Sequence, residues 1–416
     1  MDNPAARGIV RAMDVVLIGG GLNGSALALA LAGAGLRVTL VERLAPEVRT
    51  DADFDGRGYA LAHSSMRLLR ALGVWDAVAG QAQPISRIKV SDGRAGQGAS
   101  PLMLHFDGAE IEEDPPGFIL EDRFLRRAMQ AAMDAAPGLT QHTGVPVSGH
   151  EVDARGARVY LDDGTVLAGR LIVGADGHRS PTATRAGIRR LEWSYRQVGF
   201  SCAIAHERPH GGIAHQLFMP PGPLAVLPLP GNRSSVGWTE TETAADRIGA
   251  LDDAGYLAML RPRVGDFLGD FRLEGQRFAY PVLLSVAHRY AASRVVLIGD
   301  AAHRLHHLAG QGLNAGLKDV GALAEVVVEA ARRGEDIGRL DVLQRYERWR
   351  RFDAATLAVV TDGVNRLFSN DNPLLRLGRD LGLAAVNGWP GLRRGLMREA
   401  AGVTGDLPKL LRGQAI

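Results

Sequence analysis

A glycine-rich turn between two apolar runs is the feature of this chain that most restricts its fold. The run at 14–19 (DVVLIG) has the continuous apolar pattern of a buried parallel strand. The turn GGGLNG at 19–24 matches GxGxxG, and the small apolar residues that follow as far as Ala34 favour a helix packed on a sheet. A second apolar run at 37–42 (RVTLVE) ends in an acid. This order of strand, turn, helix, strand and acid predicts a dinucleotide-binding βαβ unit.

The spacing of the glycines has a physical reason. Gly19 permits the tight turn, Gly21 lets the backbone approach a pyrophosphate, and Gly24 lets the helix lie close to the strand. Amide groups at the start of the helix can then hold phosphates. Glu42 stands where a carboxylate accepts hydrogen bonds from the adenosine ribose and disfavours a 2′-phosphate. We therefore expect FAD or NAD rather than NADP, and a glycine-rich turn without a ligand is the alternative.

The same opening segment also has a second interpretation. Residues 15–36 carry no charge, so they could be taken for a signal peptide or a membrane span. The ordered glycines and the strand that follows favour the nucleotide fold instead. The single cysteine, Cys202, allows no internal disulfide, which is typical of a reducing compartment. We expect a cytoplasmic protein.

Composition argues against a nucleic-acid-binding protein and leaves association with a membrane surface open. A chain with 46% apolar and 23% charged residues is typical of a folded globular protein of two or three domains. The net charge of +2 is too small to indicate nucleic-acid binding. Residues 345–416, however, hold twelve Arg or Lys and seven Asp or Glu, a balance of +5. This leucine-rich tail either rests on the anionic inner face of a membrane or simply carries its arginines on solvated helix faces.

Two further apolar runs end in aspartate. The run at 170–175 (RLIVGA) leads into Asp176, and the run at 294–299 (RVVLIG) ends at Gly299 and leads into Asp300. The segment GQGLN at 310–314 then opens an apolar helix from about residue 315 to 332. Open α/β sheets bind their ligands at the carboxyl ends of strands, so we expect all three strand ends to contact one nucleotide.

These motifs together resemble a known family. They are GGGLNG at 19–24, ER at 42–43, DGRGYAL at 55–61, GADGHRS at 174–180, GDAAHRLHHLAGQGLNAGLKD at 299–319 and TDGVNRLFSND at 361–371. The chain resembles the FAD-dependent aromatic hydroxylases related to p-hydroxybenzoate hydroxylase. Within that group it is most similar to the ring hydroxylases of ubiquinone biosynthesis, chiefly through the motif at 361–371.

The resemblance implies an α/β fold with three parts. A Rossmann-like FAD-binding domain is expected from residues 1–85, 119–190 and 279–342. A mainly antiparallel β-sheet substrate domain, inserted into it, is expected from 86–118 and 191–278, where short apolar runs alternate with proline and glycine turns. Residues 343–416 form a helical C-terminal segment, interrupted near Asn372-Pro373 and Trp389-Pro390. Leu217, Phe218 and Val226 are candidates for the walls of the substrate pocket.

The resemblance also assigns residues to the cofactor. The expected FAD-binding residues are Gly19, Gly21, Gly24, Glu42, Arg43, Arg57, Arg123, Asp176, Gly299, Asp300, Gly312, Leu313 and Asn314. Asp300 would accept a hydrogen bond from a ribityl hydroxyl, and residues 312–314 would open a helix facing the flavin pyrimidine. Arg57 and Arg123 would contact the diphosphate or the ribityl chain, unless each forms only a surface ion pair. Asp176 would support both the flavin and transient NADH or NADPH.

The expected catalytic residues border the reacting ring. They are His306, His307, Gly310 and Gln311. A neutral histidine there could take or relay the proton of a phenol, whose pKa of about 10 hinders ionisation at neutral pH. Together with His303 these histidines could also suggest a metal site, but no further ligand completes a set of four, and we expect no metal. The chain departs from the family at His307, where a proline is usual, and at Ala183, where an arginine is frequent and Arg185 is the nearest substitute.

The implied activity is a monooxygenase reaction. FAD reduced by NADH or NADPH would react with O2 to a flavin C4a-hydroperoxide, which hydroxylates a phenolic, polyprenylated ring. A membrane surface and a quinone-biosynthesis complex are possible partners; the oligomeric state is not predicted. Three alternatives stay open: a related flavin reductase or halogenase, a hydroxylase of a small soluble phenol, and a non-catalytic FAD-bound member of a complex.

Overall fold

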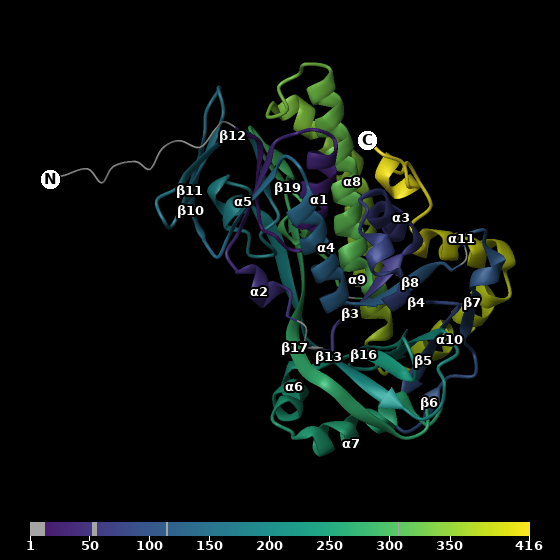
Figure 1. The fold of residues 1–416 in the computed structure, drawn as a ribbon. Coiled ribbons are helices and arrows are strands. Elements are labelled where there is room, and N and C mark those ends of the chain that lie inside the picture. Colours follow the sequence, from purple (N-terminus) through teal and green to yellow (C-terminus); the bar gives the residue numbers. More distant parts are fainter. Residues whose placement is uncertain (1–12, 52–55, 114, 307) are drawn as a thin grey trace.

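Two sheets of different kinds organise the chain, one parallel at its centre and one mainly antiparallel (Figure 1). The computed structural model describes residues 13–51, 56–113, 115–306 and 308–416. The first sheet runs β10-β11-β12-β1-β2-β9, with β19 paired to β12 and β18 to β19. Its strands are β1 (Met13–Ile18), β2 (Val38–Glu42), β9 (Leu139–Thr143), β10 (Val147–Val152), β11 (Ala157–Leu161), β12 (Val166–Gly174), β18 (Ala291–Ala292) and β19 (Val295–Leu297).

Strand β1 shows why this sheet is buried on both faces. Successive side chains of a strand point to opposite faces, so Val15 and Leu17 enter one core while Val16 and Ile18 enter the other. Both cores are apolar, which explains the unbroken hydrophobic run in the sequence. The core on the first face also contains side chains of α1 (Leu22–Gly33), α3 (His63–Ala71), α4 (Asp122–Ala135), α8 (Gln311–Arg332) and α9 (Leu340–Phe368) (Figure 1). The short helices α2 (Pro46–Arg49) and α5 (Pro181–Arg185) follow β2 and β12.

The second sheet lies below the first in Figure 1 and is mainly antiparallel. Its order is β20-β17-β13-β16-β15-β14-β5-β6, with β7 paired to β5. The strands are β5 (Arg87–Arg94), β6 (Gly98–Ala99), β7 (Leu104–Asp107), β13 (Arg190–His206), β14 (Ile213–Met219), β15 (Gly222–Leu229), β16 (Arg233–Thr241), β17 (Phe271–Ala287) and β20 (His303–Arg304). Helices α6 (Glu242–Gly249) and α7 (Asp253–Val264) cover one face.

Several segments link the two sheets. The 17-residue strands β13 and β17 pair along almost their whole length, and residues 278 and 279, the predicted domain boundary, lie inside β17. A small sheet of β3 (Gly58–Ala62), β8 (Gly117–Glu121) and β4 (Gln83–Pro84) contacts β15 of the second sheet and helix α8. The α/β class, with a Rossmann-like domain, an inserted antiparallel sheet and a helical tail, is therefore confirmed.

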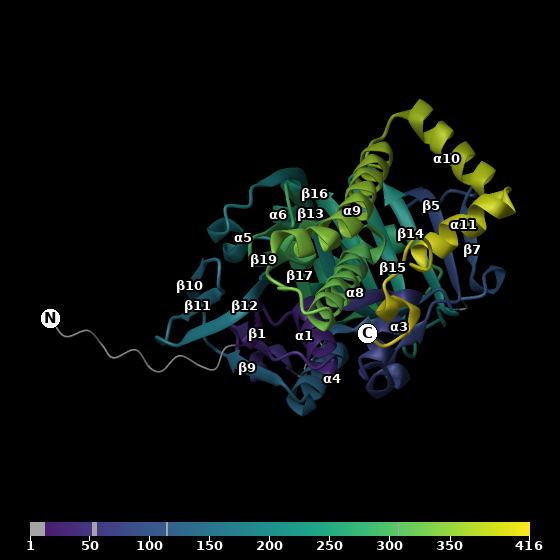
Figure 2. The same ribbon diagram turned by 90° about the horizontal axis from the view of Figure 1, so that it is seen from above.

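The C-terminal segment is helical and is held at both ends. It contains α9 (Leu340–Phe368), α10 (Pro373–Asn387) and α11 (Pro390–Ala400), and the breaks fall at the predicted prolines. Figure 2 shows α10 and α11 beyond the end of α9 and the chain returning to α3. There the 3-10 turn Lys409–Arg412 packs on α3 and α8, and the Lys409 amide donates to Glu325 at 2.7 Å. Within the described residues, no helix is both long and apolar enough to cross a bilayer.

Candidate functional site: three strand ends and an apolar cavity

The ends of β1, β12 and β19 lie side by side. The Ala175 amide donates to the Ile18 carbonyl at 2.8 Å, and the Ile298 amide donates to the Gly174 carbonyl at 3.0 Å. The glycine-rich turn, the Asp176 turn and the Asp300 turn, far apart in sequence, therefore leave the same edge of the sheet. This edge is where open α/β sheets bind nucleotides.

Two glycines of the first turn are required by close backbone contacts. Gly19 has φ +107°, and a Cβ there would lie 2.4 Å from the Ala175 carbonyl oxygen. A Cβ on Gly24 would lie 1.9 Å from the Gly19 carbonyl oxygen, so helix α1 can start here only without a side chain. At Gly21, by contrast, a Cβ would meet nothing within 4 Å. The backbone at Gly21 is thus open to a ligand, as the motif predicts.

Asn23 locks the first turn to the third. A Cβ on Gly299 would lie 2.5 Å from Asn23 Nδ2, and a Cβ on Gly316 would lie 2.1 Å from the same atom. The Asn23 side chain therefore occupies space that exists only because both partners are glycines. It joins α1 to the 3-10 turn Gly299–Ala301 and to the first turns of α8. The glycine-rich turn is therefore packed closely against Gly299 and Gly316.

Glu42 is fixed beside the glycine-rich turn. Its carboxylate accepts the Gly20 amide at 2.7 Å and the Leu44 amide at 2.9 Å. Arg43, the other residue of the predicted pair, is exposed. Arg49 on α2, which no motif indicated, lies over the turn, because a Cβ on Gly20 would be 2.9 Å from its Nη1. Its Nε and Nη1 are buried without a hydrogen-bond partner among the described residues, so this guanidinium is suited to an anionic group of a bound nucleotide.

Asp300 presents a free carboxylate at the third strand end. The residue is exposed, its backbone carbonyl accepts Arg190 Nη2 at 3.0 Å, and its side chain forms no hydrogen bond or ion pair with the described part of the chain. A short carboxylate held by its backbone but open at its side chain is available to accept from a ligand hydroxyl.

A buried carboxylate behind this turn was missed in the sequence. Asp319 on α8 is fully buried and accepts the Gly299 amide at 2.9 Å, His303 Nε2 at 2.7 Å and Arg350 Nε at 2.9 Å. Burial alone would raise the pKa of the Asp319 carboxyl, but the charges and hydrogen bonds of His303 and Arg350 outweigh it and the pKa is lowered. The ionised Asp319 therefore holds the Gly299–Asp300 turn in place. His303 is part of this network, and the described residues contain no metal-binding group of three or more His, Cys, Asp or Glu.

Replacing Asp300 by asparagine should weaken FAD binding about tenfold, because a charge-assisted hydrogen bond becomes a neutral one. The side-chain size is retained, so the fold should not change. The dissociation constant can be measured from the quenching of flavin fluorescence. Asp246→Asn, at an exposed site on α6, is the matched control. An unchanged constant in Asp300→Asn would remove this residue from the set of cofactor contacts.

The Asp176 carboxylate is directed to its own polypeptide segment. It accepts the Thr182 amide at 3.0 Å and Thr182 Oγ1 at 2.7 Å, and it also accepts the Ser180 hydroxyl. Asp176 therefore shapes the turn that leads into α5. Ala183, on the buried side of this helix, packs in the core, and Arg185 donates to the carbonyls of residues 147 and 148, each at 3.0 Å. Arg185 is thus occupied on β10.

Arg57 and Arg123 each pair with a buried carboxylate. Arg57 Nη2 lies 3.2 Å from Asp122 Oδ2, and Arg123 Nε lies 2.8 Å from Glu121 Oε2. Arg126 and Arg233 join the same two acids, at 2.6 Å in each case. Arg233 also pairs with Glu274 at 2.8 Å, so four guanidinium groups face three carboxylates and one positive charge is left in excess next to β3 and β8. This excess fits a diphosphate, although the side chains are held by protein partners.

The first turn of α8 is tied to β3. Gly310 precedes the helix in the left-handed conformation, φ +62°, and a Cβ there would lie 2.9 Å from Ala60 Cβ. Asn314 Nδ2 donates to the Ala60 carbonyl at 2.8 Å, while its Oδ1 accepts the Ala62 amide at 2.9 Å. Leu313 is half-buried, and a Cβ on Gly312 would meet nothing within 4 Å. The first amides of the helix lack intrahelical acceptors and can therefore stabilise negative charge on a ligand.

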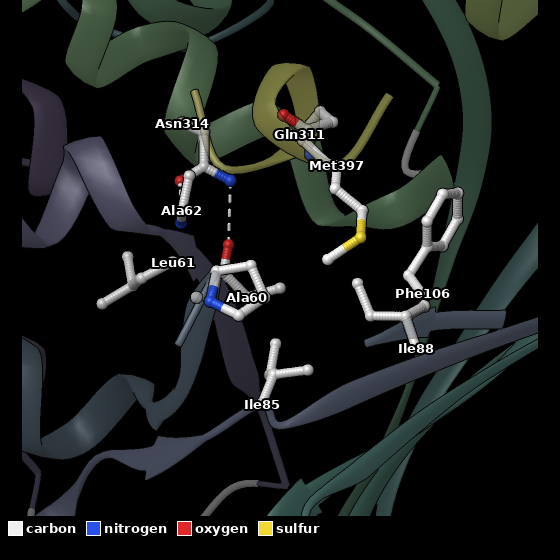
Figure 3. A pocket seen from close by; sticks show the side chains of 12 residues that line it. Ala60, Leu61, Ala62, Ile85, Ile88, Phe106, Gln311, Asn314 and Met397 are labelled. Atoms are coloured by element: carbon white, nitrogen blue, oxygen red, sulfur yellow. Dashed lines mark hydrogen bonds between the residues drawn. The ribbon is translucent and has the colours of Figure 1, made fainter. Parts of the chain in front are cut away.

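An apolar cavity of about 100 Å3 lies beside this turn (Figure 3). Gln311 and Asn314 of α8 line it together with Ile88 of β5, and Met397 points into it from α11. The remaining lining residues are Ala60, Leu61, Ala62, Ile85, Phe106, Pro116, Gly117 and Ala400. Leu217, Phe218 and Val226, the predicted wall candidates, do not line this cavity. Leu217 and Val226 pack in the core under α6 and α7, and the Phe218 ring stacks on Phe368 at 4.1 Å.

Of the predicted catalytic residues, the structure brings Gln311 and Gly310 to the cavity region, whereas His306 lies deeper. His306 is fully buried, its Nδ1 accepts the Leu308 amide at 3.1 Å, and its ring meets the Tyr195 ring edge-on at 5.1 Å. Burial lowers the pKa of His306 to about 4, so the imidazole is neutral with its hydrogen on Nε2. His307 lies outside the described residues.

The residues at this edge fit FAD. The open backbone at Gly21 and Gly312, the unpartnered nitrogens of Arg49 and the free carboxylate of Asp300 are the features that a dinucleotide with a ribityl chain requires.

Comparisons with known proteins agree with this geometry. The FAD binding domain family matches residues 12–359. The chain is 41% identical to the ubiquinone hydroxylase UbiL of Rhodospirillum rubrum over 420 residues, covering 99% of this chain and 96% of that protein. It is 33% identical to the 3-demethoxyubiquinol 3-hydroxylase of Escherichia coli over 393 residues, covering 94% and 98%. The crystal structure of the p-nitrophenol 4-monooxygenase PnpA from Pseudomonas putida shares the fold, with a TM-score of 0.79 at 19% identity over 95% of this chain and 98% of that one. The chain therefore belongs to the FAD-dependent monooxygenases, within the group of aromatic-ring hydroxylases of ubiquinone biosynthesis.

Proposed function

We propose that this protein hydroxylates the ring of a polyprenylated phenol on the route to ubiquinone. One atom of O2 enters the ring and the other leaves as water, with two electrons from NADH or NADPH. The observation that carries this proposal is the apolar cavity beside the first turn of α8, at the edge of the nucleotide site. Its volume is of the order of the cavity of about 150 Å3 that holds one benzene ring in another protein.

Oxygen activation and transfer are the chemistry that the reduced flavin supplies when it is bound. The protein contributes three other effects. The amides of residues 311–314 stabilise negative charge next to the cavity. The apolar walls, among them Ile88, Phe106 and Met397, exclude water from the reacting groups. His306 is neutral with its hydrogen on Nε2, so this nitrogen can donate a hydrogen bond, and the ring can relay a proton only if its tautomer changes.

The decisive experiment measures NADH and NADPH oxidation by the purified holoprotein with labelled dioxygen. A polyprenylated phenol should accelerate the oxidation and receive one labelled oxygen atom. Acceleration only by short, water-soluble phenols would support the small-substrate alternative. Oxidation without oxygen insertion would indicate a reductase, and no response to any phenol would favour the non-catalytic role.

Replacing Met397 by tryptophan should obstruct the cavity. Overpacking of this kind typically costs about 1–3 kcal/mol, so the KM for the prenylated phenol should rise about tenfold. FAD binding should be unchanged, because α11 does not reach the glycine-rich turn. Met259→Trp, at an exposed position on α7, is the control. Wild-type kinetics in Met397→Trp would show that the substrate uses another cavity.

We also propose that the tail helices rest on the cytoplasmic face of a membrane. An exposed apolar surface, here called the tail face, consists of Leu374, Leu377, Leu381, Trp389, Leu392 and Leu396. On the opposite side of α10 the buried Arg379 pairs with Asp92 at 2.6 Å, and on α11 Arg393 pairs with Glu110 at 2.7 Å. These ion pairs fix the helices so that the leucines and Trp389 point outward. Such leucines beside a tryptophan and arginines are typical of interfacial helices.

The helix α11 connects the tail face with the cavity. Met397 is buried at the cavity, whereas Leu392 and Leu396 on the same helix are exposed. The helix α11 therefore separates the tail face from the cavity. A substrate could keep its long apolar chain near the lipid while its ring occupies the cavity. This arrangement favours a prenylated substrate over a small soluble phenol.

The triple variant Leu374→Ser/Leu377→Ser/Leu381→Ser should reduce binding to vesicles that contain anionic lipid. Burying one leucine contributes about 1.5–3 kcal/mol. Because the wild type would bury three leucines in part, the affinity of the variant for vesicles should fall at least about tenfold. Cosedimentation with phosphatidylglycerol vesicles measures this binding. Leu191→Ser, an exposed leucine on β13, should bind like the wild type. If the wild type does not sediment with vesicles, the tail face serves a protein of a quinone-biosynthesis complex instead.

A further inference from the structure

A second cavity, of about 260 Å3, lies on the other side of the large sheet from the first. We call it the distal cavity, and its main lining residues are Lys89, Ser91, Met103, His215, Leu217 and Phe267. Ile88 of β5 lines the first cavity, whereas its neighbours Lys89 and Ser91 line the distal one, because alternate residues of a strand face opposite sides. Figure 1 shows β5, β6 and α7, which surround it, at the end of the molecule away from α1.

Three polar side chains of the distal cavity have unused hydrogen-bonding capacity. Ser91 is 2% exposed, and its Oγ has no hydrogen-bond partner in the part of the chain that the structure describes. Lys89 and His215 are paired in register on β5 and β14, and within the described residues neither side chain forms a hydrogen bond or an ion pair. Buried polar groups are normally satisfied. Lys89 and His215 are half-buried, whereas the Ser91 hydroxyl is buried and has no partner among the described residues. An ammonium, a hydroxyl and an imidazole thus line one cavity with capacity to spare, and the unsatisfied Ser91 in particular indicates a ligand.

The other lining residues indicate the size, polarity and charge of the ligand. The Phe267 ring lies against the His215 ring, with centroids 4.4 Å apart and planes tilted by 33°, and Met103, Leu217 and Val264 add apolar surface. Asp266 also lines the cavity, so one acidic side chain opposes the attraction of Lys89 for anions, and a ligand with more than one negative charge is disfavoured. Burial, together with the charge of Lys89, lowers the pKa of His215 to about 4, so the ring is neutral and can donate one hydrogen bond.

We propose that the distal cavity binds a small monoanionic carboxylate with an apolar, ring-sized body. The carboxylate accepts hydrogen bonds from Lys89 and Ser91, and the body packs on Phe267 and Leu217. No covalent step is involved. The site is separate from the flavin edge, so its occupancy does not depend on the proposed hydroxylation and can be tested independently of it.

The test uses the FAD-loaded protein and 4-fluorobenzoate, followed by fluorine NMR. We expect saturable binding in the wild type and at least about tenfold weaker binding in Lys89→Met, because a charge-assisted contact is lost. Lys409→Met, which removes a lysine paired with Glu329 on another face, should bind like the wild type. Ser91→Ala, which removes only a hydroxyl, should also weaken binding, and it replaces Lys89→Met if that variant does not fold.

Two further ligands test the chemical class. Neutral 4-fluorobenzamide should bind at least about tenfold more weakly than the carboxylate, because it lacks the charge. Inorganic phosphate should not displace the carboxylate. The proposal is overturned if the wild type shows no binding up to about 10 mM, where affinity is negligible. Equal binding to the wild type and Lys89→Met, or preferential binding of phosphate, would overturn it as well.

Discussion

Replacing Asp319 by alanine should lower the free energy of unfolding by about 3–5 kcal/mol, because it breaks a buried ion pair and leaves the buried Arg350 with only the exposed Asp353 as an ion-pair partner among the described residues. Arg350 and His303 are both almost fully buried, and Asp319 is the acceptor that they share. The turn that carries Asp300 also loses its hydrogen bond from the Gly299 amide to this carboxylate. The measurement is equilibrium unfolding in urea, and FAD affinity is expected to fall in parallel.

A matched control separates this effect from the loss of any ion pair. Asp341 pairs with Arg339 on the surface, and Asp341→Ala should leave the urea midpoint unchanged within error. The double variant Asp319→Ala/Arg350→Met should lose less stability than the sum of its single variants, because the uncompensated cation is removed. Additive losses would show that Asp319 and Arg350 do not act as a pair.

The variant Gly24→Val should be purified without FAD, or should not fold. A Cβ at this position would lie 1.9 Å from the Gly19 carbonyl oxygen, and the added methyl groups would increase the overlap. The turn and helix α1 cannot both keep their places, so the phosphate-binding amides are displaced. The absorbance of the purified protein near the flavin bands gives the FAD content directly.

Gly33→Ala is the control for this variant. It lies on the same helix, but a Cβ there would meet nothing within 4 Å. Alanine should retain full FAD content and stabilise the helix by roughly 0.5–1 kcal/mol. A yellow, stable Gly24→Val protein would contradict the close packing of α1 on the glycine-rich turn.

The parts of the fold that sequence predicted well are those encoded by local patterns. The apolar runs at 14–19, 170–175 and 294–299 became β1, β12 and β19, because a buried parallel strand requires unbroken apolar residues. The GxGxxG turn was predictable because its glycine spacing is itself a local pattern, and the contact that excludes a side chain at Gly24 is with the nearby Gly19 carbonyl oxygen. The helix breaks at Pro373 and Pro390 were predictable because proline lacks an amide hydrogen.

The parts that sequence missed depend on contacts between distant segments. Asp319 is 16 residues from His303 and 31 from Arg350, and no local pattern shows that one carboxylate accepts from both. Arg49 lies on a four-residue helix without a motif, so only the folded chain places it over the glycine-rich turn. Met397 was assigned to a tail segment, yet the return of α11 makes it a wall of the cavity. Leu217 and Val226 face away from that cavity, because which side of a strand meets the flavin edge depends on how the sheets pack.

The anchored C-terminus has a practical and an evolutionary consequence. Residues 409–412 pack on α3 and α8, and Arg332 donates to the Ile416 carbonyl at 3.1 Å. The stretch from α9 to the C-terminus is therefore attached to the rest of the protein at both of its ends. Substitutions on the exposed side of α10 and α11 can therefore change which lipid or protein this surface contacts, while the two attachment points keep Met397 at the cavity. The outer surface and the cavity wall can thus evolve independently, although the same helices carry both.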